Sequence, residues 1–411
     1  MNPKILRIIK IVGRKADQKN LKTYLVGGIV RDVLLKRNNL DIDIVVEGSG
    51  ILLAQEIARE QKKKLIIYPQ FKTATLFWSE DIHIDFATAR KESYPFSGAL
   101  PVVAPGNIRD DLFRRDFTIN AMAISINKDS FGQLVDEFGG LVDLQHKKIR
   151  ILHDKSFIED PTRILRAVRF EQRFRFCIQT HTLNLLKEAL KKELFKNVKA
   201  QRYFNEFKKM LKERDVVLCF KRLIQLKALS FLSPGIKINL PLLQQIDKNI
   251  QNLRRVSSRV DPSVDLICLM ILLERLKPKA LEALLSRFNL RREDRVAIVE
   301  SYKWKDIETK LSRGHLKPSE GYLILKPLSQ TTILYLRFRS LKRIVWQRID
   351  RFLKNDQMVK IFLTGEDIKN LGCTSGQKIG EVLDNVLYEK IDGKLNNKQQ
   401  EYKRAKELIL L

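Results

Sequence analysis

The sequence predicts an α+β domain in the first third of the chain, followed by helices up to the end. Between residues 23 and 151, short apolar stretches alternate with turns and with a helical segment. After residue 160 the strand signals nearly vanish, and amphipathic helical patterns take over. Because 411 residues exceed what one hydrophobic core usually organises, we expect the chain to fold into several modules.

The expected strands of the first module are short, and one of them carries acidic and apolar residues on opposite faces. A helix is expected between them at 51–62. Together these elements make a module of about 130 residues, which is an ordinary size for a domain. The expected strands are 24–26, 41–46, 65–67, 75–77 and 83–86.

The chain is strongly basic, with 77 Lys and Arg residues against 48 Asp and Glu residues and a formal charge of +29. Each phosphate that a basic side chain neutralises releases counterions, so this surplus favours a polyanionic partner such as a nucleic acid. A membrane surface is the alternative, because residues 1–15 are basic and carry Ile and Leu at near-helical spacing. No run of about 18 apolar residues occurs, so no membrane-spanning helix is expected.

The four cysteines lie far apart and include no CxxC pair. This spacing is typical of neither a zinc site nor a disulfide framework, and it suits the reducing cytoplasm. Residues 1–15 also lack the uninterrupted apolar stretch of a secretion signal. We therefore expect a cytoplasmic protein with buried, inert thiols at Cys177, Cys219, Cys268 and Cys373.

A glycine pair, Gly27-Gly28, followed by Arg31 is part of the strongest motif of the sequence. A strand that leads into paired glycines and then into a helix lets backbone amides come close to a triphosphate, and the helix N-terminus favours its negative charge. The Arg31 guanidinium can add a forked donor for a phosphate oxygen. We therefore expect Gly28 and Arg31 to bind a nucleotide.

Two acids, Asp41 and Asp43, follow about ten residues downstream. Side chains at positions i and i+2 of a strand share a face, so the two carboxylates would repel each other unless a cation lay between them. Mg²⁺ prefers oxygen ligands and substrate phosphates, and a two-metal site activates the attacking hydroxyl while it holds the leaving pyrophosphate. Asp85, on another expected strand, is the candidate third acid. Alone, an Asp-x-Asp pattern is more typical of an exposed strand edge, but the upstream motif favours the metal site.

A second constellation places Asp160, Arg163, Arg166 and Arg169 at steps of three residues. On one helix this spacing forms a slowly rotating stripe, although a surface ion-pair ladder would have the same pattern. Asp160 only accepts hydrogen bonds and Arg163 only donates them. The pair therefore matches the Watson–Crick edges of cytosine and adenine and mismatches those of guanine and uracil. Arg166 and Arg169 would position this pair or contact phosphate.

These motifs resemble the nucleotidyltransferase superfamily, and within it the class II branch of bacterial CCA-adding enzymes and poly(A) polymerases. Four ordered motifs between residues 27 and 170 carry the resemblance, and the stretch 363–393 is also similar. The resemblance implies a polymerase-beta-like head with a mixed sheet, followed by an all-α neck, body and tail. The implied ranges are 1–145 for the catalytic head, 146–210 for the base-recognising neck, and 211–352 and 353–411 for the tRNA-binding body and tail.

The resemblance also implies roles for individual motifs. In the second motif, 114–123, Arg115 and Asp116 offer a fork and an acceptor to ribose hydroxyls. The third motif contains Gly139-Gly140 and resembles a hinge between head and neck. The fourth motif reads the incoming base and adds Glu159 to the nucleotide-binding residues. The turn-rich stretch 91–101 resembles a mobile loop of CCA-adding and A-adding members.

The expected function is template-independent addition of CCA to the 3′ end of tRNA, from CTP and ATP, with Mg²⁺ as cofactor. An A-adding enzyme that works beside a CC-adding partner is an alternative, because such members share the head motifs and the loop. A CC-adding enzyme is less expected, since those members shorten or lack the loop. A poly(A) polymerase is also less expected, because residues 67–75 lack the Gly-Arg-Arg-Phe-like stretch of those enzymes.

Two alternatives come from other classes of protein. The chain could be a non-catalytic RNA-binding protein on the same scaffold, but the intact Asp41, Asp43 and Arg163 argue against this reading. A metal phosphohydrolase would depend on His153-Asp154. None of the five histidines supplies a convincing partner pair, so we expect His153 to be structural or exposed.

Overall fold

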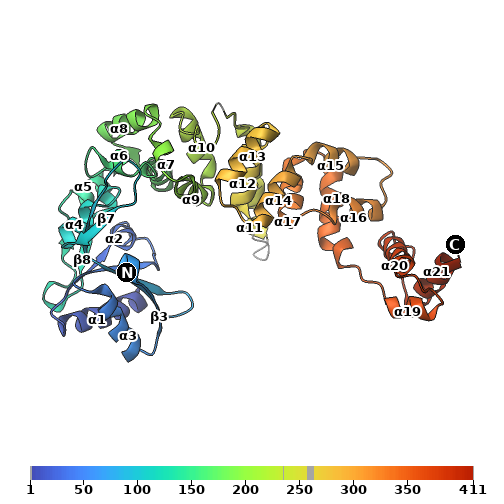
Figure 1. The fold of residues 1–411 in the computed structure, drawn as a ribbon, viewed down its shortest axis with the longest axis horizontal. Coiled ribbons are helices and arrows are strands. Elements are labelled where there is room, and N and C mark those ends of the chain that lie inside the picture. The colour runs from blue at the N-terminus through green and yellow to red at the C-terminus, as the bar shows by residue number, and fades with distance from the viewer. Residues whose placement is uncertain (1, 235, 257–262, 411) are drawn as a thin grey trace. The chain divides into compact units, whose positions relative to one another are not determined.

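A computed structural model describes residues 2–234, 236–256 and 263–410, with the backbone alone at 252–256. The chain divides into two compact units, Met1–Pro234 and Gly235–Leu411. All strands of the described chain lie in the first unit, and the second unit is helical (Figure 1). The predicted order, an α+β module followed by helices, is therefore confirmed.

A seven-stranded mixed sheet forms the centre of the first unit. Strands β2 (Ile42–Glu47) and β5 (His83–Thr88) run parallel, whereas the other neighbouring pairs are antiparallel. The five predicted strands and the helix predicted between them are all present. The order is β3-β4-β5-β2-β1-β8-β9, with β1 at Lys22–Val26, β3 at Lys64–Tyr68, β4 at Thr73–Phe77, β8 at Ala123–Ser125 and β9 at Leu134–Val135.

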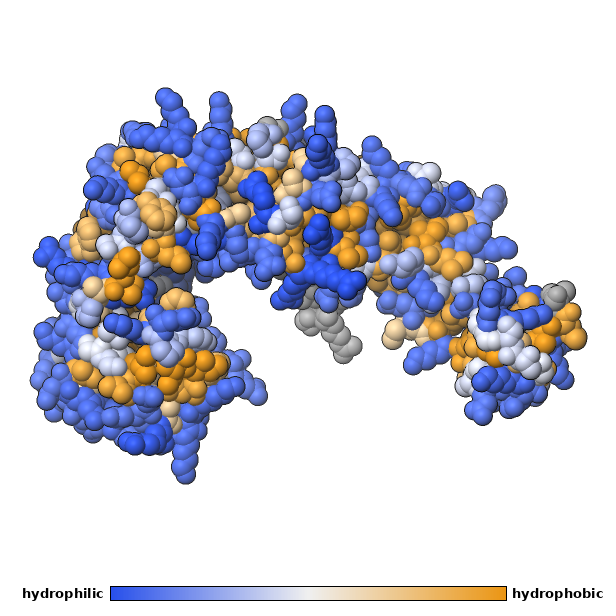
Figure 2. Space-filling view, in the orientation of Figure 1, coloured by the Kyte–Doolittle hydropathy of each residue, from blue (hydrophilic) through white to orange (hydrophobic). Residues whose placement is uncertain are grey.

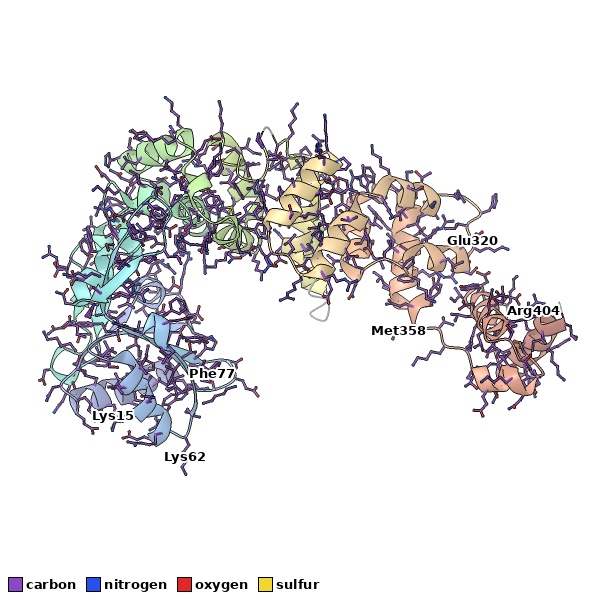
Figure 3. All side chains as sticks on the ribbon, in the orientation of Figure 1. Lys15, Lys62, Phe77, Glu320, Met358 and Arg404 are labelled. Atoms are coloured by element: carbon purple, nitrogen blue, oxygen red, sulfur yellow. The ribbon has the colours of Figure 1, made fainter. Side chains whose placement is uncertain are left out.

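Two helices, α1 (Pro3–Asp17) and α3 (Gly50–Glu60), pack against the sheet and against each other (Figure 1). The apolar face of α1, from Ile5 to Val12, is buried in the core of the unit. Lys15 of α1, labelled in Figure 3, forms ion pairs with two glutamates of α3. The apolar face that supported the membrane-surface alternative is therefore covered by the protein itself.

The stretch predicted as a mobile loop contains a two-stranded antiparallel ribbon, β6 (Arg90–Ser93) and β7 (Val102–Pro105), which is separate from the main sheet. Residues 94–101 form the turn between these strands. The sequence analysis missed both strands because they have only four residues each and alternate too briefly to give a periodic signal. β8 and β9 were missed for the same reason.

After the sheet, the chain packs around α7 (Arg163–Phe174), which contacts both α9 (Ala200–Leu211) and α10 (Val216–Gln225). The predicted boundary between neck and body at 210/211 thus falls within a group of helices that pack together in the first unit. The finer four-part division stays a prediction. The other elements of this part are α2 (Gly28–Leu34), α4 (Ile108–Phe113), α5 (Gly140–Gln145), α6 (Ser156–Glu159), α8 (Thr180–Lys191), and the parallel pair β10 (Lys148–Ile149) and β11 (Cys177–Ile178).

In the second unit, α12 (Val264–Leu273) is apolar and buried at every residue except Asp265, as expected for a helix at the centre of a bundle. The helices around it and beyond it are amphipathic to different degrees. They are α11 (Leu240–Val256), α13 (Pro278–Arg287), α14 (Arg292–Ser301), α15 (Trp304–Leu311), α16 (Pro318–Leu325), α17 (Gln330–Arg339) and α18 (Arg343–Lys354).

The last three helices form a small core of their own from residues including Ile368, Val386 and Ala405. Arg404, labelled in Figure 3, joins the last two of them through its ion pair with Glu389 at 2.8 Å. This part lies within the range 353–411 that the resemblance implies for the tail. Its helices are α19 (Gly365–Asn370), α20 (Gly376–Ile391) and α21 (Lys398–Leu410).

Polar side chains cover most of the visible face of each unit (Figure 2). Among the described helices, none combines the length and apolar character needed to cross a membrane. All four cysteines are free thiols. Three of them are buried as predicted, but the prediction was wrong for Cys177, which is exposed because the short β10–β11 pair lies at the surface.

Candidate active site

A cavity of about 730 Å³ opens in the first unit between the end of β1, the start of β2 and helix α7. It collects ten of the twelve predicted site residues, although they come from segments more than 100 residues apart. Asp85 and Glu159 are the two predicted residues that do not line it. The ten that do are Gly28, Arg31, Asp41, Asp43, Arg115, Asp116, Asp160, Arg163, Arg166 and Arg169.

Gly27 forms the sharp turn between β1 and α2, with φ at +72°, a backbone conformation that glycine adopts readily. A Cβ at this position would lie 2.7 Å from Arg115 Nη1 and 3.8 Å from Asp43 Oδ2. The missing side chain therefore lets an arginine and an acid approach the turn together. This arrangement leaves the Gly27-Gly28 backbone exposed to the cavity, where a phosphate group would find a positive side chain nearby.

Asp43 and Asp85 occupy opposed register positions on the parallel strands β2 and β5. Asp41 immediately precedes β2 and does not lie on the strand itself, so the predicted start of this strand was one residue early. Burial is the largest cause of a raised pKa at Asp43. The neighbouring Asp85 and Asp41 raise it further, Arg115 opposes them, and the resulting pKa is about 6. The raised pKa shows that burial and the two neighbouring acids outweigh the Arg115 guanidinium at this corner of the cavity.

Asp85 is exposed and accepts a hydrogen bond from Thr75 Oγ1 on β4 at 2.5 Å. No three His, Cys, Asp or Glu side chains in the described chain converge closely enough to hold a metal ion by themselves. Mg²⁺ commonly binds through one or two carboxylates and completes its shell with waters and substrate phosphates. The Asp41–Asp43 pair supplies two carboxylates to the cavity and fits a cation of that kind. A metal role for Asp85 stays a prediction.

The Arg31 guanidinium is largely engaged within the protein. It donates to Asp32 through Nε and Nη2, both at 3.0 Å, and to Asn120 Oδ1 at 2.6 Å. It also lies over the Phe174 ring, 4.5 Å from the centroid. Asn120 thus braces the local structure, since its side chain bridges Arg31 and Asp116. Arg31 lines the cavity but retains few free donors, and its phosphate contact stays a prediction.

Asp116 is buried and accepts four hydrogen bonds, which is about the full capacity of a carboxylate. Two come from Arg166, at 2.6 and 2.8 Å, one from Asn120 and one from the Phe117 amide. Burial alone raises the pKa of Asp116, but Arg166 and the hydrogen bonds outweigh it and lower the pKa to about 2. Asp116 therefore orients Arg166 in this structure. A ribose contact by Asp116 would require it to exchange one of these partners, and that role stays a prediction.

Arg163, Arg166 and Arg169 face the cavity from α7, but Asp160 does not belong to that helix. Asp160 lies in extended backbone at the end of α6, and α7 begins only at Arg163. The single-helix prediction was wrong here because Pro161 intervenes, and the residue before a proline disfavours helical backbone. The acid and the arginines nevertheless line one cavity.

The Arg163 guanidinium is buried. It donates to Ser156 Oγ at 2.6 Å and to the Arg114 carbonyl at 2.8 Å. Arg169 faces Glu206 and Glu213 at 3.5 Å, and its Nε is buried without a hydrogen-bond partner in the described structure. The helix therefore presents a fixed row of cations, not a solvated ion-pair ladder.

Glu159 is separated from the other predicted residues. It lines a smaller cavity of about 390 Å³, where its carboxylate lies 3.4 Å from His153 Nε2. The ring of His153 lies against that of Phe113, with 5.0 Å between the centroids and a tilt of 32°. His153 is thus held by one glutamate and one aromatic ring, which agrees with the structural role predicted for it and gives no support to a phosphohydrolase site.

Two acids that shape the cavity were missed in the sequence. Asp111 is fully buried and accepts hydrogen bonds from both Arg114 and Arg115, at 2.7 and 2.9 Å. Glu92 accepts from Arg114 and from Tyr94, and both Glu92 and Tyr94 line the cavity. The i,i+3 and i,i+4 spacing of Asp111 from the two arginines was a usable signal. The pairing of Glu92 with Arg114, 22 residues away, was not readable from the sequence.

The Gly139-Gly140 turn, predicted as a hinge, is tightly packed in this structure. The Asp136 carboxylate accepts hydrogen bonds from the Gly140 and Leu141 amides, at 2.7 and 2.8 Å. A Cβ at Gly140 would lie 2.3 Å from the Thr118 carbonyl oxygen. The glycine is explained by this close approach, and a hinge motion stays a prediction.

The first unit combines a mixed sheet, two acids beside a glycine turn, and a helix with three arginines on the same cavity. Together these features define the head of a nucleotidyltransferase. Comparison with protein families agrees with this assignment. Residues 23–150 match the poly A polymerase head domain, and residues 175–240 match the probable RNA and SrmB- binding site of polymerase A.

Relatives with similar sequences cover nearly the whole chain. An A-adding tRNA nucleotidyltransferase of Halalkalibacterium halodurans is 34% identical over 98% of this chain and 92% of its own length. One of Geobacter sulfurreducens is 33% identical over 97% of this chain. This chain spans only 46% of the Geobacter protein, and 45% of a third A-adding relative from Aquifex aeolicus.

Solved structures are also similar over the whole length. The apo form II of a CCA-adding enzyme has a TM-score of 0.81 and 35% identity, and the match covers 98% of this chain and 95% of that one. The Thermotoga maritima CCA-adding enzyme complexed with tRNA has a TM-score of 0.75 at 34% identity and the same coverage. A complex of a CCA-adding enzyme with ATP has a TM-score of 0.79 at 33% identity, again with that coverage. The chain belongs to the tRNA nucleotidyltransferase and poly(A) polymerase family.

Proposed function

We propose that the protein adds nucleotides to the 3′ end of tRNA without a nucleic-acid template and releases pyrophosphate. The observation that carries this proposal is one cavity of about 730 Å³ that is lined both by Asp41 and Asp43 and by Asp160 and Arg163. The acids for phosphoryl transfer and the residues that would read the base therefore line one cavity, where a single nucleotide would contact both. Similar proteins are named as tRNA nucleotidyltransferases, and one similar structure contains tRNA.

In the proposed reaction, Asp41 and Asp43 hold Mg²⁺, with Asp85 as a third acid next to them. When bound, the ions lower the pKa of the attacking 3′ hydroxyl and stabilise charge on the leaving pyrophosphate. The Gly27-Gly28 turn and Arg115 bind the triphosphate, since the turn is open to the cavity and the guanidinium lies against it. The protein supplies orientation and charge, which are the main contributions that phosphoryl transfer requires.

Base choice follows from hydrogen-bonding capacity. Asp160 accepts and Arg163 donates, so adenine or cytosine pairs with both, whereas guanine or uracil leaves a buried group without a partner at a cost of about 1–3 kcal/mol. Arg163 is held in place by Ser156 and the Arg114 carbonyl. A donor that is fixed in this way discriminates better than a mobile one, because it cannot adapt to the wrong edge.

Full CCA addition from CTP and ATP is our first candidate, because Asp160 and Arg163 suit both bases and the ribbon with its turn is present. The addition of A alone is the second candidate. It is favoured by the names of three relatives that match 90–98% of this chain, which are A-adding tRNA nucleotidyltransferases. We infer a location in the cytoplasm from the four free thiols.

The test uses the purified full-length chain with two tRNA substrates, one that ends before position 74 and one that ends in CC. A CCA-adding enzyme extends both when CTP and ATP are supplied. An A-adding enzyme extends only the tRNA that ends in CC, and a CC-adding enzyme extends only the shorter tRNA with CTP. A poly(A) polymerase adds long A tracts, and a non-catalytic binding protein extends neither substrate. Either of the last two results contradicts the proposal.

A further inference from the structure

The turn 94–101 is attached to the neck helices and not to the head sheet. The Gly98 amide donates to the Glu159 carbonyl at 3.2 Å. Gly98 has φ at +74°, and a Cβ there would lie 2.6 Å from the Asn197 carbonyl oxygen. The adjacent Ala99 is buried. The turn therefore packs so closely against the Asn197 carbonyl that only glycine fits at position 98.

Arg202, on α9, contacts both this turn and the base-reading acid. Its Nη1 donates to the Gly98 carbonyl at 3.0 Å and to the Ala99 carbonyl at 3.4 Å. Its Nη2 lies 3.4 Å from Asp160 Oδ2. The donors of a planar guanidinium are fixed relative to one another. When one of its contacts moves, the whole plane tilts and the other contacts change their direction.

The other oxygen of Asp160 is held from the opposite side. Oδ1 accepts hydrogen bonds from the Thr162 hydroxyl at 2.7 Å and from the Thr162 amide at 3.1 Å. The plane of the carboxylate is therefore set by Thr162 on one oxygen and by Arg202 on the other. Among the described residues, Oδ2 makes the longer ionic contact with Arg202 alone, so it keeps acceptor capacity for a ligand in the cavity.

We propose that Arg202 is a specificity-determining positioning residue, which orients Asp160 toward the incoming base as long as the turn 94–101 is docked. The inference rests on the proposed function and adds to it a residue that does not line the cavity. Selectivity at such a site depends on an acceptor that stays within about 10–20° of its productive orientation. Without Arg202, Asp160 can rotate about its side-chain bonds and accommodate the wrong base edge.

The test compares single-nucleotide incorporation of ATP and UTP into tRNA that ends in CC, measured as kcat/KM. Arg202→Met should lower the ATP:UTP preference by about tenfold, the usual effect of losing one charged hydrogen-bond contact. Arg202→Lys, which keeps the charge but not the fork, should fall between Met and wild type. The matched control is Lys208→Met, which removes one positive charge from the same helix and should leave the preference unchanged.

A second variant tests the same contact by changing the turn 94–101 instead of Arg202. Gly98→Ala forces the turn away from Asn197, so Arg202 loses its carbonyl partners while its own side chain is intact. It should lower the ATP:UTP preference as Arg202→Met does, and the double variant should be no worse than either single one. Thermal melting of each variant separates lost selectivity from lost folding, and if Arg202→Met does not fold, Gly98→Ala and Arg202→Lys carry the test.

The possible outcomes are distinct. If the wild type adds no nucleotide to tRNA, the proposed function fails. If the wild type discriminates and Arg202→Met and Gly98→Ala keep the same preference, the function stands and the role of Arg202 is overturned. Independent, additive effects of the two changes would also overturn it, because the turn would then act by another route.

Discussion

Asp43 and Asp85 face each other across the parallel strands β2 and β5, and their proximity helps to raise the pKa of Asp43 to about 6. Burial is the larger cause of this shift. In the absence of metal, the folded protein therefore holds a proton at Asp43 that the unfolded chain loses near pH 4. Stability falls as the pH rises from about 4 to about 6, after which the loss is complete.

The first prediction follows from this relationship. In metal-free buffer at pH 7.5, Asp43→Asn should be more stable than the wild type by on the order of 1–3 kcal/mol, and the difference should vanish near pH 4. Thermal unfolding at both pH values measures it. Mg²⁺ should then raise the Tm of the wild type more than that of the variant. Equal stability of the two proteins at pH 7.5 would mean that the surroundings of Asp43 do not raise its pKa.

Asp41→Ala and Asp43→Ala should each reduce nucleotide incorporation by at least about 10³-fold, because two-metal chemistry loses a ligand. Binding of tRNA should stay within about twofold of wild type, since acidic side chains do not neutralise the RNA phosphates, and phosphate neutralisation dominates affinity. Incorporation assays and filter binding give the two numbers. Substantial turnover by either variant would rule out the acid pair as the metal site.

Arg163→Ile should relax base choice, so that the ATP:UTP preference on tRNA that ends in CC falls by about tenfold or more. It should also destabilise the protein by about 1–3 kcal/mol, because Ser156 and the Arg114 carbonyl lose their buried donor. Kinetics with each nucleotide and denaturant unfolding test the two parts separately. A destabilised variant with unchanged discrimination against UTP would show that Arg163 is a structural residue only.

The affinity for tRNA should fall steeply with salt, because a chain with a charge of +29 binds phosphates mainly through counterion release. If about five phosphates are neutralised, a plot of log affinity against log salt has a slope of roughly −3 to −5. Fluorescence anisotropy between about 50 and 200 mM salt provides the plot. A slope near zero would mean that the basic surface does not carry the binding.

The sequence predicted the sheet and most of the site because these depend on local patterns. The strand that carries Asp43 begins with alternating apolar and polar residues. The glycine turn before it lets other side chains come close to its backbone. The sequence placed Asp160 on the same helix as Arg163 because the three-residue spacing is regular, and the effect of Pro161 was overlooked. The predicted local geometry was therefore wrong, but Asp160 and Arg163 still line the same cavity.

Other features depended on contacts between distant segments. The hydrogen-bond saturation of Asp116 requires Arg166, 50 residues away, to reach it. Glu159 sits among the site motifs in the sequence, yet its side chain turns to His153 and into another cavity. The ribbon around residues 90–105 likewise has no periodic signature. Tertiary packing decided these positions, and a single sequence does not display it.

The most direct test of the account is a crystal structure of the protein with Mg²⁺ and a non-hydrolysable ATP analogue. The account predicts metal density between Asp41 and Asp43, the triphosphate along the Gly27-Gly28 turn, and the adenine edge against Asp160 and Arg163. A nucleotide bound outside this cavity, or bound in it with its phosphates away from the two acids, would contradict the account.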